Sequence, residues 1–209
     1  LTTASIDNFQ VYGFIKNTSG IGLVFNETGE TVTKNNSNVW TYAHTQYWTR
    51  NEHYFAALAP FTAKQWELER ATDEKLVNGI GEVTFTNNGT QDLLYWAGKF
   101  DNAGGAYEQN PVHIEFNHLL SKVKFSFKNA FDNNQVSLVV RDITITNAES
   151  KGTIDLAVEN WWDGDDWKLT EYKEGDAAFA VFGNAATAEN RMTTTGGAVE
   201  SDKEMLLFP

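Results

Sequence analysis

The chain has 209 residues, of which 28 are acidic and 16 are basic, and its formal net charge is −12. This balance argues against binding to nucleic acid or to anionic membranes, because both attract basic surfaces. Hydrophobic residues at 41% and aromatic residues at 13% are ample for a core, and the lack of cysteine excludes a disulfide or a thiol nucleophile. The sequence contains no run of about 18 apolar residues, the length that a membrane-spanning helix needs.

Alternating apolar residues and turn residues divide the first hundred residues into short strands. Residues 6–15 carry Phe9, Val11 and Ile15 on one parity and end at turn residues, which predicts a first strand with one buried face. Residues 54–59 (YFAALA) are apolar on both parities, as expected of a central strand. Further strand-like segments are 21–25, 39–44, 83–85 and 92–96, with a polar loop over 31–37.

Two local patterns interrupt this series of strands. Residues 63–75 are rich in Lys, Gln, Glu, Leu and Arg, which favour helices, so we expect one short helix there. The Asn-Asn-Gly sequence at 87–89 separates two strand-like segments and indicates a hairpin.

The strongest pattern lies in residues 112–127, where the alternation changes phase. Val112, Ile114 and Phe116 alternate with polar residues, as in a strand with one buried face. Beyond them the apolar residues occupy the other parity: Leu119, Val123, Phe125 and Phe127. A strand cannot shift by one residue and keep the same face buried, so we expect a bulge or corner at 117–120.

Later segments repeat the strand pattern and set the predicted fold class. Residues 136–140, 143–145 and 154–158 alternate, with turn residues between them. Short strands with almost no helix predict an all-β chain, an antiparallel β-sandwich with Greek-key-like connections. We expect residues 1–160 to form this sandwich and residues 161–209 to form a linker and the beginning of a second, truncated β domain, opened by a strand at 205–208.

The expected core joins residues from several of these segments. His118 is predicted to be buried at the corner, with its ring bonded to irregular main chain. Leu119, Val123 and Phe125 are expected in the core beside it. We also expect the two sheets to share one core that contains Phe55, Phe116, Phe125 and Ile143. The aromatic residues Tyr47, Trp48 and Tyr54 are also expected to be core residues, because aromatic side chains dominate sandwich interiors.

The sequence gives little support for catalysis or metal binding. The four histidines, His44, His53, His113 and His118, lack the HxH, HxxH and HExxH spacings of metal sites. The nucleophile motif G-x-S-x-G and the Gly-rich phosphate loops are also missing. We therefore predict no catalytic residue, no metal and no cofactor.

One loop has the composition of a ligand site or an interface. Its candidate residues are Trp161, Trp162, Asp163, Asp165 and Trp167. Aromatic faces beside carboxylates can stack on a sugar ring and bind its hydroxyls, and clustered surface aromatics can also mark a protein interface. The simpler alternative is that these tryptophans pack onto the nearest sheet. The segment does not match the calcium-loop pattern D-x-[DN]-x-[DN]-G.

Four short blocks, in order, resemble one protein family. Residues 116–123 (FNHLLSKV) resemble the F-x-H-x-L-S-K-V block of the fimbrillin-like proteins of Bacteroidetes, which are pilins and adhesins. Trp40 with residues 47–48 and 54–60 resembles the family's W…YW…FFAYAP block, and residues 92–94 its D-L-L segment. Residues 205–209 (MLLFP) resemble the apolar run and proline that open the family's second domain.

The resemblance implies a fold, a role and a location. It implies a transthyretin-like sandwich, a structural or adhesive subunit of a cell-surface fimbria, and export to the outer membrane as a lipoprotein precursor with its lipid-bearing cysteine upstream of Leu1. Its partners would be other fimbrial subunits, and host or bacterial glycans or proteins. Fimbrillins assemble when an Arg-specific protease removes an N-terminal strand and a neighbour's strand fills the groove, so an apolar groove or open strand edge is expected in the first domain. The alternative is a carbohydrate-binding module that uses the 161–167 loop.

Overall fold

The computed structural model describes part of the chain, and the described residues form strands, turns and extended segments without a helix. Within them, no helix is long and apolar enough to cross a membrane. The described residues are 6–62, 64–70, 79–102, 111–130, 138–139, 144–146, 148–157, 168–172, 179–180, 191–192, 199–200 and 204–209.

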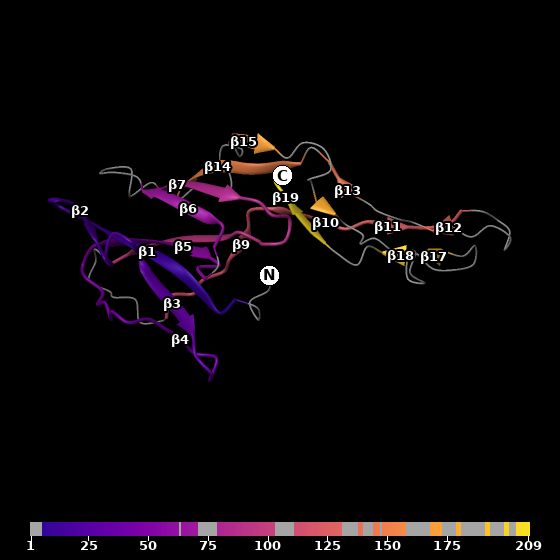
Figure 1. Cartoon of the computed structure of the whole chain (residues 1–209). Coiled ribbons are helices and arrows are strands. Elements are labelled where there is room, and N and C mark those ends of the chain that lie inside the picture. Colours follow the sequence, from indigo (N-terminus) through magenta and orange to yellow (C-terminus); the bar gives the residue numbers. More distant parts are fainter. Residues whose placement is uncertain are drawn as a thin grey trace. The chain divides into compact units, whose positions relative to one another are not determined.

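A seven-stranded antiparallel sheet dominates the N-terminal part of the chain (Figure 1). Its strand order is β4-β3-β1-β5-β8-β9, and β2 pairs with the C-terminal half of β1. The strands are β1 (Asn8–Asn17), β2 (Gly20–Leu23), β3 (Glu30–Lys34), β4 (Trp40–Thr41), β5 (Glu52–Ala59), β8 (Leu94–Asp101) and β9 (Asn117–His118).

β5 is the centre of this sheet because its apolar residues fill both faces. It pairs with β1 on one side and β8 on the other, and every residue from His53 to Ala59 is buried. Phe14 pairs with Tyr54 on one face, whereas Val11 pairs with Ala57 on the other. The prediction of a central strand over 54–59 is confirmed.

A second sheet has four strands in the order β15-β14-β7-β6. They are β6 (Trp66–Arg70), β7 (Gly79–Thr86), β14 (Glu149–Ala157) and β15 (Lys168–Tyr172). Trp66 pairs with Phe85, and both side chains are buried. The predicted helix over 63–75 is wrong. Residues 66–69 read Trp-Glu-Leu-Glu, and pairing with β7 uses this period of two to bury Trp66 and expose Glu67. Together the two antiparallel sheets confirm the all-β sandwich class.

Two further local predictions are corrected by the sheet topology. β7 belongs to the second sheet and β8 to the first, so Asn87-Asn88-Gly89 connects two sheets and does not close a hairpin. The expected polar loop over 31–37 begins as β3, because Thr31 and Thr33 are tolerated on a strand whose Val32 side chain is buried.

The chain forms two compact units and passes between them more than once. The first contains residues 1–86, 92–119 and 152–168, and the second contains residues 87–91, 120–151 and 169–209. The domain boundary predicted near residue 160 falls within residues 158–167, outside the described part of the chain, and stays a prediction.

The second unit is built from antiparallel ladders that follow one another along the chain. β10 (Ser121–Val123) pairs with β19 (Met205–Leu207), and Asn87 Nδ2 donates a hydrogen bond of 2.8 Å to the Leu206 carbonyl. Residues 205–207, predicted to open a further domain, therefore pair with the chain's own β10. The other pairs are β11 (Ser126–Phe127) with β18 (Val199–Glu200), β12 (Leu138–Val139) with β17 (Arg191–Met192), and β13 (Thr144–Ile145) with β16 (Phe179–Ala180).

The phase change at 112–127 has a structural counterpart. The chain bends at Leu119 and Leu120, between β9 and β10, within the predicted corner. The two sides of the bend contribute to different apolar clusters. Phe116 packs against the cluster that contains Phe55, whereas Phe125 packs against Met205. The prediction of one shared core is therefore wrong for Phe125, and Ile143 lies outside the described residues.

Candidate functional site

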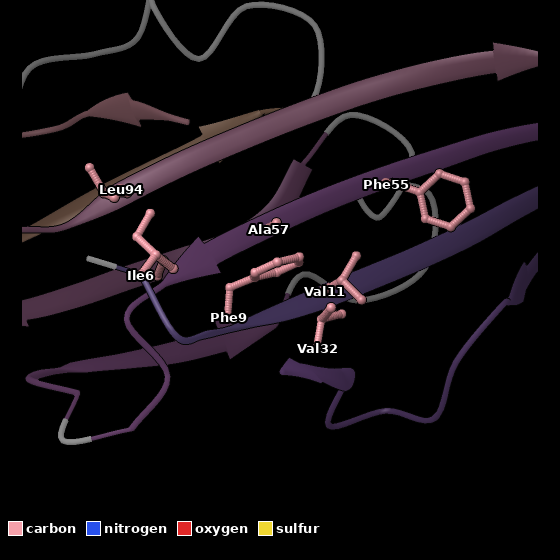
Figure 2. Close-up of a cluster of buried hydrophobic side chains, with 8 residues drawn as sticks. Ile6, Phe9, Val11, Val32, Phe55, Ala57 and Leu94 are labelled. Carbon is pink, nitrogen blue, oxygen red and sulfur yellow. The ribbon is translucent and has the colours of Figure 1, made fainter. Parts of the chain in front are cut away.

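One face of the seven-stranded sheet carries a continuous apolar floor. Phe9 and Val11 of β1, Val32 of β3 and Phe55 of β5 are each at most 8% exposed and belong to one cluster (Figure 2). They share a face because Phe9 pairs with Val32, and Val11 pairs with Ala57, which is two residues from Phe55.

Gly13 gives the Phe55 ring its place on this floor. The two residues are paired in the β1–β5 register. A Cβ atom at Gly13 would come within 2.9 Å of the Phe55 ring and within 2.8 Å of the Val24 side chain. A glycine is therefore needed here for close packing rather than for its backbone conformation.

A groove of about 610 Å³ lies against this floor, and it is lined mainly by two further segments together with Val24, Phe25 and Trp96. One wall lies within residues 40–48 and contributes Trp40, Tyr42, Tyr47 and Trp48. The other wall lies within residues 111–116, an extended segment that belongs to no strand. The volume is within the range of ligand and peptide sites. We refer to this feature as the groove.

Aromatic contacts join both walls to the floor. The Phe9 ring centroid lies 5.2 Å from that of Trp40 and 5.3 Å from that of Phe116, so one floor residue touches both walls. Trp48 meets the Phe55 ring edge to face at 5.8 Å. Aromatic pairs at such distances add attraction beyond simple burial.

The rim of the groove exposes aromatic surface to solvent. Tyr47 is 83% exposed and Tyr42 is 45% exposed, and both line the groove. Tyr47 was expected in the core, and this expectation is wrong. Exposed aromatics around an apolar depression are typical of interaction sites.

The groove contains little charge. His53, at one end, is 1% exposed, and its Nδ1 lies 3.0 Å from the Asn51 carbonyl. Burial lowers the pKa of His53 below 6.5, although the contact with Asn51 opposes this change. The ring is therefore neutral at pH 7. The other polar lining residues are Gln46 and His113.

A buried carboxylate holds the wall formed by residues 40–48. Glu30 on β3 is 5% exposed, and its Oε1 accepts hydrogen bonds from the backbone amides of Ala43 at 2.9 Å and His44 at 3.2 Å. Its Oε2 lies 2.9 Å from His44 Nδ1. Burial raises the pKa of Glu30, but the hydrogen bonds with His44 and Ala43 outweigh burial and leave the pKa below 4.5.

The ligand or interface residues predicted from the sequence are not among the residues that the structure describes. Trp161, Trp162, Asp163, Asp165 and Trp167 fall outside the described residues. No group of three potential metal ligands occurs among the described residues.

His118 is not a core residue, which corrects its predicted burial. Its side chain is 53% exposed, and its Nδ1 lies 2.5 Å from the buried Asp92 carboxylate. The neighbouring Leu119 and Leu120 are buried instead, and Val123 is half-buried.

Comparison with known proteins identifies the family. A family model described as fimbrillin-like matches residues 2–209. The chain belongs to the fimbrillin-like family. No curated protein and no solved structure gave a significant match. Fimbrillin-like proteins are structural pilins rather than a catalytic family, and membership implies a surface-exposed fimbrial component that assembles with other subunits.

The groove of this fimbrillin-like chain was only partly visible in its sequence. Residues 40–48 (WTYAHTQYW) are rich in aromatic residues, and this clustering is the sequence feature that indicates a groove wall. The same density also suits a core strand. The anchoring role of Glu30 left no signal, because its partners lie 13 and 14 residues away in an irregular segment.

Replacing Glu30 with Gln is expected to lower the free energy of unfolding by about 1–2 kcal/mol at pH 7, because the charged hydrogen bonds to 43–44 are weakened. The folded pKa of Glu30 is below its unfolded value, so its stabilisation is complete above about pH 4.5 and is lost as pH falls through the folded pKa. The difference between wild type and Glu30→Gln should therefore shrink in acid. Urea unfolding at pH 7, 5 and 3 measures it.

His44→Gln is the matched control, since it keeps the carboxylate and both backbone amide bonds. A smaller loss at pH 7 is expected for this variant. A Glu30→Gln difference that stays constant from pH 7 to pH 3 would contradict the role assigned to the ionised carboxylate.

Proposed function

We propose that this chain is a non-catalytic structural subunit of a cell-surface fimbria and that neighbouring subunits join by donating a β-strand to the groove. Membership of the fimbrillin-like family supports the fimbrial role. The observation that carries the strand-donation part is the groove itself, with its apolar floor and exposed aromatic rim.

An extended strand suits this groove in shape and chemistry. Alternate side chains of a strand point to one face at intervals of about 6.6–6.8 Å, so a donor with apolar residues at every second position presents a row of them. The floor residues Phe9, Val11 and Phe55 offer apolar contacts to such a row. A charged donor side chain would gain no partner from the neutral His53 at the end of the groove.

Because the chain is strongly acidic, apolar contacts have to overcome charge repulsion between subunits. A net charge of −12 makes free subunits repel one another at long range. Burying the exposed rings of Tyr42 and Tyr47 would supply short-range attraction that salt does not screen. Subunits are then soluble apart and joined only where the groove is filled.

Localisation and partners follow from the same proposal. We propose attachment of the fimbria to the outer membrane by a lipoprotein route, with other fimbrial subunits as partners and glycans or proteins of host or bacterial surfaces as adhesion targets. The carbohydrate-binding alternative depends on residues 161–167, which lie outside the described residues.

Immunogold electron microscopy of producing cells tests the proposal. Antibody against this chain should label filaments, and filaments should be lost from cells that lack the chain or carry it in a form that cannot assemble. A chain that remains monomeric after Arg-specific proteolysis and labels no filament would contradict strand donation. Binding in a glycan screen by such a monomer would favour the carbohydrate-binding alternative.

A further inference from the structure

Residues 111–116 lie along the groove as an extended segment with a strand-like alternation. Val112, Ile114 and Phe116 are half-buried, whereas Pro111, His113 and Glu115 are exposed. The three half-buried residues line the groove, and the exposed Pro111 and His113 border it as well. This is the side-chain pattern of a strand placed on an apolar surface. The segment is nevertheless assigned to no strand, in contrast to β9, which follows it directly.

The C-terminal end of this segment is firmly fixed. In β9, His118 pairs with Leu94 of β8, and the Leu119 amide donates a hydrogen bond of 2.9 Å to the Leu93 carbonyl. Asp92, which is 2% exposed, lies 2.5 Å from His118 Nδ1 and also accepts a 2.9 Å hydrogen bond from the Leu93 amide. Residues 111–116 are therefore anchored at their C-terminal end, where β9 begins.

The contact between segment and groove floor is made by side chains. Phe116, nearest the anchor, packs edge to face on Phe9 at 5.3 Å. Ile114 and Val112 follow at two-residue spacing, farther from the anchor. Half-buried side chains gain only part of the stabilisation of full burial, so these contacts are replaceable by a strand that buries its apolar face more completely.

We propose that residues 111–116 are a strap, an internal stand-in for a donor strand, which leaves the groove floor when a partner's extended segment enters. This inference rests on the proposed strand donation and adds a regulatory step to it. The strap shields the floor of the free subunit and competes with the partner. A site that is open 1% of the time binds its partner about 100-fold more weakly than an open site, so strap strength sets the apparent affinity.

A synthetic peptide that copies residues 111–117 (PVHIEFN) tests the strap in the full chain. Ile114→Asn weakens the strap's hold on the groove without altering the floor. Fluorescence anisotropy of the labelled peptide should show binding to Ile114→Asn at least about 10-fold tighter than to wild type. Ile114→Ala, a milder change, should give an intermediate gain, and Glu115→Gln, on the exposed side of the strap, should match wild type.

Two outcomes would overturn the strap. Equal or weaker peptide binding by both Ile114 variants would mean that residues 111–116 are a fixed wall, and filaments formed by the wild type would still support the proposed function. Peptide binding by none of the chains would mean that the floor does not accept a strand of this sequence. The absence of labelled filaments on cells that produce the wild-type chain is the separate result that contradicts the proposed function itself.

Discussion

Trp66→Ala is expected to lower the free energy of unfolding by about 3–5 kcal/mol, as large aromatic deletions from a core do. The Trp66 side chain is 1% exposed, and its Nε1 donates a 2.8 Å hydrogen bond to the Pro60 carbonyl. The variant loses the packing of the ring beside Phe85 and leaves the part-buried Pro60 carbonyl without this donor. Urea unfolding monitored by circular dichroism measures the loss.

Tyr47→Ala is the matched control for this truncation. It removes a ring that is 83% exposed, so the free energy of unfolding should change by at most about 0.5 kcal/mol. If Trp66→Ala were as mild as Tyr47→Ala, residues 66–70 would not be a core strand and the sandwich described above would be wrong at that edge.

The double variant Tyr42→Ser and Tyr47→Ser is expected to reduce the yield of fimbriae at least about 10-fold while leaving the subunit folded. Both rings are on the groove rim and are 45% and 83% exposed, so their loss should change stability little. Exposed aromatics that become buried on association carry much of the binding energy of an interface, and two such losses exceed the 1.4 kcal/mol that gives a tenfold change. Fimbriae sheared from cells and quantified by immunoblot give the yield.

Val39→Ser is the control for the rim, because Val39 is 53% exposed but does not line the groove. Its yield of fimbriae should match wild type. If the double tyrosine variant also assembled normally, the rim would not be part of the subunit interface, whatever the groove floor contacts.

The parts of the fold that sequence reasoning predicted were those where local pattern and tertiary environment agree. Residues 54–59 are apolar on both parities and form the central strand β5, buried on both faces. The phase change after Phe116 predicted a corner, and the chain bends at 119–120. In both cases the spacing of apolar residues along the strand is sufficient to determine which of its faces must be buried.

β6 was missed because local preference and tertiary pairing disagree. Glu67, Leu68 and Glu69 are good helix formers, but the ladder with β7 and the burial of Trp66 outweigh propensities of a few tenths of a kcal/mol per residue. Propensity decides only where packing does not.

The groove was partly missed because exposure depends on contacts that a sequence does not display. Tyr47 and Phe55 are both aromatic and lie eight residues apart, yet one is 83% exposed and the other 8%. His118 likewise meets Asp92, a partner 26 residues away, and not the local main chain. The family resemblance predicted an apolar groove in the first domain, but only the structure identifies the residues that line it.

Photo-cross-linking from the groove rim tests strand donation most directly. Tyr47 is replaced by the photoreactive residue p-benzoylphenylalanine, fimbriae are assembled on cells and irradiated, and the linked peptides are identified by mass spectrometry. The proposed function predicts a link between position 47 of one subunit and a segment with alternating apolar residues in a neighbouring subunit. Filaments that form normally, but in which position 47 links only to its own subunit, would contradict strand donation to the groove.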